Sequence, residues 1–292
     1  MRSLVATILL CLTFAGPVMA EPASQSVLPN SGETKAPIRI GLTPVFLDNQ
    51  TTFVNAWRAY LSKRLNRPIE FVQRASYREI TDLLRAEKLE FAWICGAPFV
   101  RYKNELKLLS VPVYQGKTTY RSYLIVPASD KLTTSIGDLR GKIFAFSDRD
   151  SNSGYLVPVY ELQNLHQKPG SFFARTFFTW SHRNVVQSVA DGLAQAGAVD
   201  SYVWDMLAIQ SPKLTAQTRV VHASKEHGFP PFVATRNVPP EDVELMRQTL
   251  VDMSKDAEGA RLLKKLRLDG FVAGNEHLYD SIAAMIHAIA EN

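Results

Sequence analysis

Short apolar segments of strand length alternate with longer amphipathic segments along most of this 292-residue chain. Residues 38–42 read as a strand, residues 51–65 as a helix with one apolar face, and residues 69–73 as the next strand. This alternation predicts an α/β fold with mostly parallel strands, because a parallel pair is joined by a crossover that is usually a helix. Extended segments between residues 106 and 127 interrupt the rhythm, which restarts near residue 135. The chain therefore reads as two successive α/β units.

Two α/β units joined by two extended crossings predict a hinged protein with two lobes. The segments that we interpret as crossings are 124–130 and 220–229. The first lobe is then expected to combine residues 37–125 with residues 228–292, and the second lobe to comprise residues 126–227.

The first twenty residues have the features of a cleavable export signal. Arg2 supplies a positive start, Leu4–Phe14 is an apolar run shorter than the ~20 residues that cross a bilayer, and Ala20 ends a small-residue motif. We therefore expect residues 1–20 to be a signal peptide and the polar residues 21–36 to be a flexible tail. The predicted localisation is the periplasm.

Charge and cysteine content exclude several kinds of partner. The net charge is +5, and the Lys and Arg residues are scattered, with no basic block suited to nucleic acid. Removal of the signal peptide leaves Cys95 as the single cysteine, so no intramolecular disulfide is expected. His222, Glu226, His227 and Asp200 lack the spacing of a metal site. We expect neither a metal nor a cofactor.

A polar turn follows the apolar segment 143–146 and precedes an expected helix. Ser151, Asn152 and Ser153 are three consecutive hydrogen-bond donors, and Gly154 allows a close approach of the backbone to a ligand. Helix N-termini have unpaired N–H groups and a partial positive charge, so such a turn favours an anion. The alternative is ordinary N-capping by Ser or Asn. We expect Ser151 and Ser153 to lie in an exposed turn.

Several ordered pieces of the sequence resemble the periplasmic phosphate, phosphite and phosphonate-binding proteins, which are the solute-binding partners of ABC importers. The resemblance runs from about residue 38 to 285. Its pieces are Ile40–Pro44 (IGLTP), Phe91–Gly96 (FAWICG), Tyr120–Val126 (YRSYLIV), Ser151–Gly154 (SNSG), Trp180–His182 (WSH) and Val199–Asp205 (VDSYVWD).

The resemblance implies a two-lobe periplasmic-binding-protein fold with the ligand held between the lobes and no catalysis. It implies the following ligand-binding residues: Ser151, Asn152, Ser153 and Gly154 at the turn, His182 and Asp205 from the same lobe, and Phe46 and Cys95 from the wall of the first lobe. Of the aromatic residues, Tyr123 and Tyr155 are expected to line the cleft, although most aromatics in such a chain belong to the core. His182 and Asp205 have capping or core roles as alternatives.

The sequence departs from the family pattern at three places. Val45 and Phe46 replace a tyrosine common after the first strand, Asn152 replaces a common Thr, and Trp180 replaces a small residue. A bulky Trp180 is expected to narrow or cover the cleft. These changes favour a compact oxyanion over an aminoalkyl phosphonate.

The main hypothesis is an exported solute-binding protein that captures a small oxyanion for an ABC permease at the inner membrane. A second hypothesis is a sensor that docks on a histidine-kinase ectodomain, arsenite-responsive through Cys95, because a thiolate is a soft ligand; the alternative for Cys95 is a buried packing residue. The third is a hydrolase using Ser153, His182 and Asp205, which lacks a G-x-S-x-G elbow. We expect that the protein is not an enzyme.

Overall fold

The computed structural model describes residues 36–43 and 51–291, which form two mixed β-sheets with helices packed around them. The first sheet has the strand order β13-β4-β12-β3-β1-β2. Its strands are β1 (Ile38–Leu42), β2 (Ile69–Gln73), β3 (Phe91–Trp93), β4 (Leu106–Val113), β12 (Phe232–Thr235) and β13 (Gly270–Ala273). β1 pairs in parallel with β2 and β3, whereas β12 and β13 pair antiparallel to their neighbours.

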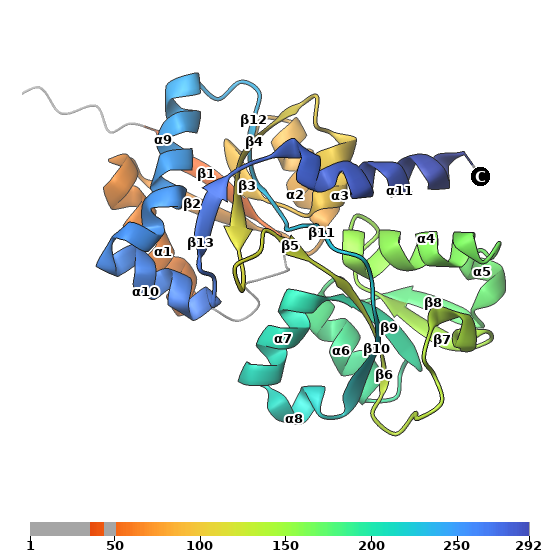
Figure 1. Ribbon diagram of the computed structural model, residues 1–292. Helices are drawn as coiled ribbons and strands as arrows, with labels where there is room; N and C mark the ends of the chain where they lie inside the picture. The colour runs from red at the N-terminus through yellow and green to blue at the C-terminus, as the bar shows by residue number, and fades with distance from the viewer. Residues whose placement is uncertain (1–35, 44–50, 292) are drawn as a thin grey trace, which may run out of the picture. The chain divides into compact units, whose positions relative to one another are not determined.

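Helices lie on both faces of the first sheet (Figure 1). One group packs together beside the sheet and consists of α1 (Thr51–Leu65), α9 (Pro240–Val251) and α10 (Ala257–Leu266). The other face carries α2 (Tyr77–Arg85) and α3 (Gly96–Arg101). The apolar face predicted for α1 is confirmed: Trp57 is completely buried, and its ring contacts Phe71, Trp93 and Phe232.

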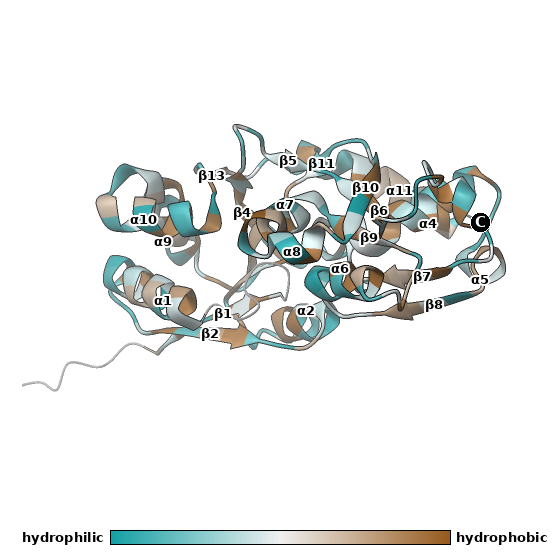
Figure 2. Cartoon of the chain, turned by 90° about the horizontal axis from the view of Figure 1, so that it is seen from below, coloured by the Kyte–Doolittle hydropathy of each residue, from teal (hydrophilic) through white to brown (hydrophobic). Residues whose placement is uncertain are grey.

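The second sheet has the strand order β10-β6-β9-β7-β8. Its strands are β6 (Ser122–Pro127), β7 (Ile143–Phe146), β8 (Arg175–Phe178), β9 (Ala196–Asp200) and β10 (Thr218–Ala223). Its helices are α4 (Val157–Asn164), α5 (Pro169–Phe172), α6 (His182–Ala190), α7 (Ser201–Gln210) and α8 (Pro212–Thr215). Figure 2 shows apolar residues along β7, as a strand covered by helices requires.

Most strands of each sheet run in one direction, as expected, but β12 and β13 in the first sheet and β6 in the second run against the others. β7 is parallel to β8 and β9, but β6 is antiparallel to β9 and β10. The alternation of strands and helices predicts parallel pairing only where a helix connects two consecutive strands. The antiparallel strands are those by which the chain enters or leaves each sheet, and their direction depends on pairing partners that are distant in the sequence.

A short two-stranded ribbon joins the sheets. β5 (Thr119–Tyr120) pairs antiparallel with β11 (His227–Gly228), and the two lie side by side between the sheets in Figure 1. The expected crossing 220–229 contains β11, whereas the expected crossing 124–130 begins inside β6 of the second sheet. The connections between the sheets therefore run close together at this ribbon.

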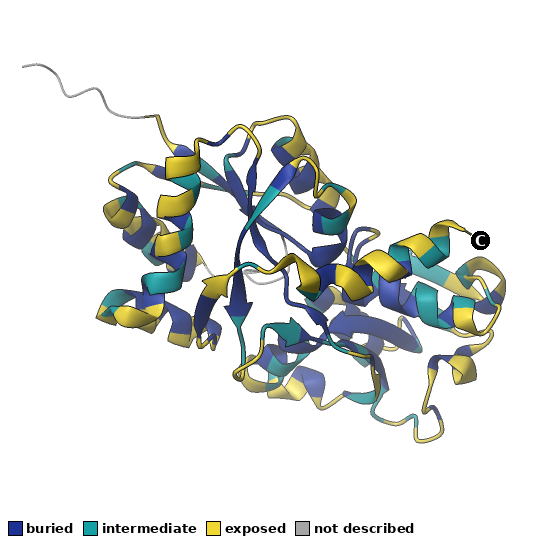
Figure 3. Cartoon of the chain, turned by 45° about the horizontal axis from the view of Figure 1, so that its top comes forward, coloured by how far each residue is buried: buried dark blue, intermediate teal, exposed yellow. Residues whose placement is uncertain are grey.

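The C-terminal helix α11 (Asp280–Ala290) contacts helices of both sheets (Figure 3). On one side it packs against α3, where a Cβ atom added at Gly96 would lie 2.6 Å from Cδ1 of Ile282. On the other side it packs against α4, where Gln163 Nε2 donates a hydrogen bond of 2.7 Å to the carbonyl of Ala288. Over the described ranges, no helix combines the length and the apolar character of a membrane span.

Candidate ligand-binding site

The polar turn after β7 ends in a π-helical turn, Asn152–Leu156, that leads into α4. Ser151 caps it, because its Oγ accepts a hydrogen bond of 3.0 Å from the N–H of Gly154. The N–H of Leu156 donates to the carbonyl of Ser151, five residues back, at 3.0 Å. Such wide turns are frequent at functional sites.

The side chains of Ser151, Asn152 and Ser153 are buried, which corrects the expectation of an exposed turn. Other elements cover them. The buried hydroxyl of Ser122, on β6, donates a hydrogen bond of 2.6 Å to the carbonyl of Ser153. Capping and burial are therefore both present, and capping alone does not account for three buried polar side chains in succession.

Residues of the first sheet and of the ribbon contact this turn directly. Cys95, at the end of β3 and before α3, accepts a hydrogen bond at its Sγ from the N–H of Asn152 at 3.2 Å. The side-chain amide of Asn152 donates to the hydroxyl of Tyr120, on β5, at 3.0 Å. The structure thus brings Cys95 and the turn together. We call the buried group Cys95, Tyr120, Ser151, Asn152, Ser153 and His182 the polar cluster.

His182 lies behind the turn, in the first turn of α6. The backbone N–H of Asp200 donates to its Nδ1 at 3.2 Å, and its Nε2 lies 3.5 Å from the Oγ of Ser151. Burial lowers the pKa of His182 to about 3. The imidazole is therefore neutral at ordinary pH, in contrast to a protonated histidine that would add charge to an anion site.

Four buried polar atoms in or around the turn are without a hydrogen-bond partner within the described residues: Asn152 Oδ1, Ser153 Oγ, Ser147 Oγ and Tyr77 OH. Buried polar groups are usually satisfied, so each unpartnered atom requires an explanation. A polar ligand that contacts the turn would supply partners. The donors of the polar cluster are hydroxyl, amide and imidazole groups, which are neutral.

Two aspartates of the same turn connect it to α2 and α3. Neither was predicted from the sequence as a residue of the site. Asp148 Oδ2 accepts from the N–H of Tyr77, in the first turn of α2, at 3.0 Å. Asp150 forms ion pairs with Arg78 at 3.3 Å and with Arg101 at 2.7 Å. Burial raises the pKa of Asp148. The alternation of Asp with Arg and Ser before Ser151 was the only sequence signal.

Asp205, Tyr123 and Tyr155 lie outside the polar cluster. Asp205 is half-buried on α7, with its Oδ2 3.5 Å from the hydroxyl of Tyr114. The ring of Tyr123 packs edge-on against Trp204 at 6.1 Å. Tyr155 packs against Phe146 and Phe178 in the aromatic core of the second sheet.

Gly154 and Phe46 are the two remaining residues expected to bind the ligand. At Gly154 a Cβ atom would lie 1.9 Å from the Oγ of Ser147, so glycine is required there by packing of the protein itself. Phe46 lies outside the described residues.

Trp180, expected to narrow or cover the cleft, has a left-handed backbone with φ of 65° and is 48% exposed. Its ring lies 6.0 Å from that of Phe178, over which the guanidinium of Arg149 stacks at 4.7 Å. The backbone N–H of Trp180 donates to the carbonyl of Ser147 at 2.7 Å, which ties this segment to the start of the polar turn. Positive φ in a bulky residue is a strained conformation.

The polar cluster does not have the geometry of a hydrolytic triad. His182 faces Ser151 rather than Ser153, and Asp205 contacts Tyr114. Because Nδ1 of His182 accepts from a backbone N–H, the neutral ring carries its proton on Nε2. A protonated Nε2 cannot accept a serine proton, as a general base must.

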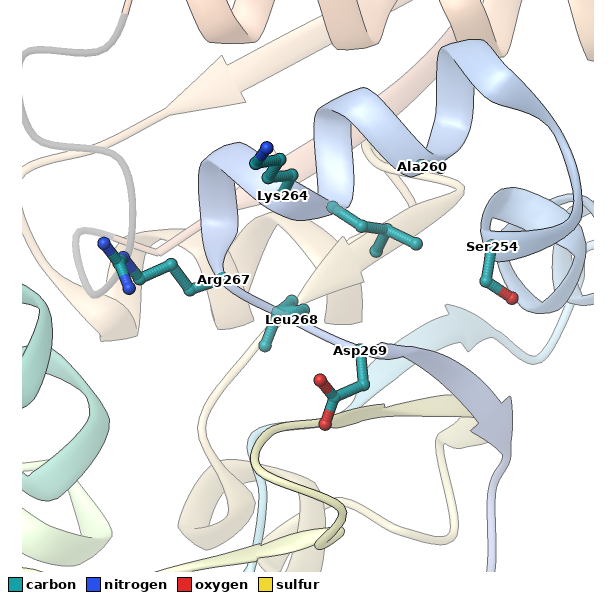
Figure 4. Close-up of a pocket in the computed structure, with 7 residues that line it drawn as sticks. Ser254, Ala260, Lys264, Arg267, Leu268 and Asp269 are labelled. Carbon is teal, nitrogen blue, oxygen red and sulfur yellow. The ribbon is translucent and has the colours of Figure 1, made fainter.

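A separate surface hollow of about 490 Å³ lies at the C-terminal end of α10 (Figure 4). Lys264, Arg267 and Asp269 are among the residues that line it. These residues belong to the first sheet's outer helices and loops, away from the polar turn. In the part of the chain that the structure describes, no group of three His, Cys, Asp or Glu residues is arranged to hold a metal ion.

Two mixed sheets joined by a ribbon, with a buried polar cluster where their elements meet, define a two-lobe solute-binding protein. A family model described as "ABC transporter, phosphonate, periplasmic substrate-binding protein" matches residues 40–279, and the chain belongs to this family. The resemblance inferred from the ordered pieces of sequence is confirmed. The protein is thus a periplasmic substrate-binding protein of the ABC transporter type.

Individual relatives agree with this assignment. A probable ABC transporter phosphite-binding protein, PhnD1, from Prochlorococcus marinus strain MIT 9301 is 24% identical over 236 residues, which is 77% of this chain and 74% of the relative. The structure of PhnD1 with methylphosphonate has a TM-score of 0.79 at 18% identity and covers 88% of this chain and 99% of that chain. At such identity the structural likeness shows the fold alone.

A second solved structure, a binding-protein component of an ABC phosphonate transporter from Pseudomonas aeruginosa, has a TM-score of 0.79 at 20% identity. The match covers 86% of this chain and 85% of that chain.

Proposed function

We propose that this protein captures a small phosphorus oxyanion, of the phosphonate, phosphite or phosphate type, and delivers it to an ABC permease at the inner membrane. The observation that carries the proposal is the buried π turn, whose three consecutive polar side chains lie beside unpartnered buried polar atoms. Phosphite and methylphosphonate are the ligands named for the PhnD1 relative. Residues 1–20 act as a signal peptide in this proposal.

The proposed ligand-binding residues are those of the polar cluster, with Gly154 shaping the turn. Neutral donors and a helix N-terminus can bind an anion without a dedicated cation. A ligand with a Kd near 1 μM corresponds to about −8 kcal/mol. Charge-assisted hydrogen bonds of about 1.5–3 kcal/mol each are sufficient for that after desolvation. Asp205 and Phe46 remain proposals from the family pattern, and Tyr123 and Tyr155 remain proposals as aromatic residues that line the cleft.

We place the division between the proposed lobes at the ribbon of β5 and β11. The ion pairs of Asp150 and the contact of Cys95 with Asn152 then cross from one lobe to the other. Contacts made only when the lobes are together favour the closed, ligand-bound state.

The sensor alternative is less well supported at Cys95. Arsenic(III) binds thiolates, whereas burial raises the pKa of Cys95 to about 11 and its sulfur already accepts a hydrogen bond. The thiol is therefore neutral and enclosed. The histidine-kinase partner and arsenite are retained as alternatives that the ligand test below distinguishes.

The test is a thermal-shift and calorimetry panel on the mature protein with phosphate, phosphite, methylphosphonate, sulfate, arsenate and arsenite. We expect at least one phosphorus oxyanion to bind, with a stabilisation of about 2.7 kcal/mol at 100 times its Kd. Ser151→Ala combined with Ser153→Ala should abolish that binding. Stabilisation by arsenite alone would favour the sensor, and no response to any phosphorus oxyanion would overturn the proposal.

A further inference from the structure

The C-terminal helix α11 is firmly attached where it begins. Tyr279, the residue before the helix, is buried, packs edge-on against the ring of Phe99 at 4.9 Å and donates a hydrogen bond of 2.8 Å to the carbonyl of Phe229. In the first turn, the Oγ of Ser281 lies 2.9 Å from Nδ1 of the buried His227, on β11. The start of α11 is therefore fixed to the first sheet and to the ribbon.

The end of α11 rests on α4, a helix of the second sheet, through a lighter contact. Gln163 Nε2 donates to the carbonyl of Ala288 at 2.7 Å, and Ile289 lines a surface hollow of about 510 Å³ that it shares with residues of α4. Ala288 and Ile289 are half-buried, whereas Ile282 and Met285, earlier in the helix, are buried. Because stabilisation by burial scales with the apolar area removed from water, the contact with α4 is the weaker of the two.

This contact exists in the same state as the contacts at the polar turn. α4 begins at Val157, directly after the π turn, and α11 packs against both. The polar turn itself contacts Cys95 and the arginines paired with Asp150, which belong to elements of the first sheet. A rotation at the ribbon that breaks these contacts also moves α4 relative to the fixed start of α11, so that the lighter contact gives way.

We propose that the last turn of α11 is a latch, which docks on α4 when the lobes close and leaves α4 when they open. This inference rests on the proposed function, in which closure at the ribbon encloses the ligand. Gln163 lies at the end of α4 opposite to the polar turn. The latch therefore changes affinity through the population of the closed state and not through a contact with the ligand.

The first experiment measures the distance between the proposed lobes, without ligand and with it, by pulsed electron spin resonance on the mature protein. Spin labels are attached at Arg58→Cys on α1 and Lys213→Cys on α8, because both residues are exposed. Gln163→Ala should lower the ratio of closed to open molecules by about 2- to 12-fold, which corresponds to the loss of one net hydrogen bond. Ile289→Ala, which weakens the contact from the side of α11, should shift the ratio in the same direction.

The second experiment is calorimetry with phosphite and with methylphosphonate. Gln163→Ala should raise the Kd by up to the same factor, because closure around the ligand becomes less favourable. The matched control is Gln167→Ala. Gln167 lines the same hollow, but its Nε2 donates to the carbonyl of Leu165 in its own segment at 3.3 Å. The control should keep the wild-type distances and affinities.

The outcomes separate the latch from the proposed function. Wild-type distances and affinities in both Gln163→Ala and Ile289→Ala, in a protein that binds either ligand, would overturn the latch. A shift caused by Ser281→Ala but not by Gln163→Ala would also overturn it, because the helix would then part from the ribbon instead. A wild-type protein that binds no phosphorus oxyanion would refute the proposed function, while the distances measured without ligand would still judge the latch. A single open population under all conditions would overturn both.

Discussion

At the scale of single residues, burial sets protonation states that the sequence does not reveal. The sequence places Ser151, Asn152 and Ser153 at a strand-to-helix turn, and the structure agrees. It cannot show that His182 is enclosed by other elements, and burial there lowers the pKa of its imidazole to about 3. Asp200 was considered only as a metal ligand, yet it caps α7 by accepting from the N–H of Val203. Burial raises the pKa of Asp200 to about 8.

The raised pKa of Asp200 predicts a loss of stability with rising pH. Its pKa is about 8 in the folded protein and ordinarily ~3.9 when unfolded. Between these two pKa values the folded state binds one more proton than the unfolded state. The contribution of Asp200 to the free energy of unfolding therefore falls by up to about 1.4 kcal/mol per pH unit as the pH rises toward 8. Urea unfolding at pH 5.5, 6.5 and 7.5 measures this change in the free energy of unfolding.

Asp200→Asn is the variant that tests this assignment, because asparagine caps helices as well as aspartate and does not titrate. We expect a flatter decline in the free energy of unfolding between pH 6.5 and 8. The lowered pKa values of His182 (about 3) and His227 (about 4) act in the opposite sense below pH 6.5 and remain in the variant. Identical slopes in the two proteins would show that Asp200 is ionised in the fold.

At the scale of elements, local rules predicted the helix at residues 51–65 and the helix that follows the polar turn, but not the contacts between elements. Ser76 caps α2, with its Oγ accepting from the N–H of Glu79 at 3.3 Å. The π turn was not predicted, because its closure onto Ser151 has no sequence signature. The two-residue strands of the ribbon are also too short for any periodicity.

The left-handed end of α10 predicts a stabilising substitution. Arg267 has φ of 52°, and its exposed side chain lines the hollow in Figure 4. Left-handed backbone costs an L-residue about 1–2 kcal/mol, and glycine avoids this cost but gives back part of the gain through its freer unfolded state. Arg267→Gly should therefore stabilise by about 1 kcal/mol.

Calorimetric melting would measure this as a rise in Tm of roughly 2–4 °C. Arg261→Gly is the control, because Arg261 is exposed in the interior of the same helix. That change should lower stability by about 1 kcal/mol. A decrease with Arg267→Gly as well would contradict the argument from backbone strain.

The two ion pairs of Asp150 predict an effect on affinity without a contact to the ligand. Asp150→Asn removes the charge facing Arg78 and Arg101, which belong to elements of the first sheet. If these pairs hold the proposed lobes together, the closed population falls and the apparent Kd rises by about 3- to 10-fold. Calorimetry with the ligand identified in the panel measures it.

Glu244→Gln is the matched control for this prediction, since its exposed pair with Arg247 lies within α9. Exposed pairs of this kind contribute little. Its affinity should equal that of the wild type. If Asp150→Asn also binds normally, the pairs do not influence closure.

At the scale of the whole molecule, the ordered pieces of sequence predicted the family and the two-lobe fold, and the comparisons confirm both. Sequence patterns did not identify the reversed strands β6, β12 and β13 or the packing of α11. The contacts of α11 with both α3 and α4 depend on surfaces built from distant segments.

Closure of the proposed lobes predicts a change in size. Small-angle X-ray scattering at saturating ligand should give a smaller radius of gyration than scattering without ligand. Without ligand, the Asp150→Asn variant should have a larger radius of gyration than the wild type, because it has lost contacts that stabilise the closed state. Superimposable profiles at saturation would argue against a hinged clamp.

The strand order of the first sheet has a consequence for how the chain folds as it leaves the membrane. β4 (Leu106–Val113) lies between β12 (Phe232–Thr235) and β13 (Gly270–Ala273), so both of its neighbours come from the C-terminal part of the chain. The second sheet, in contrast, is built from the continuous stretch 122–223. If the N-terminal part of the chain is exported first, all strands of the second sheet are available before β12 and β13. Until then both edges of β4 lack a hydrogen-bonded neighbouring strand. A chain that stalls before β12 would expose both of these edges to aggregation.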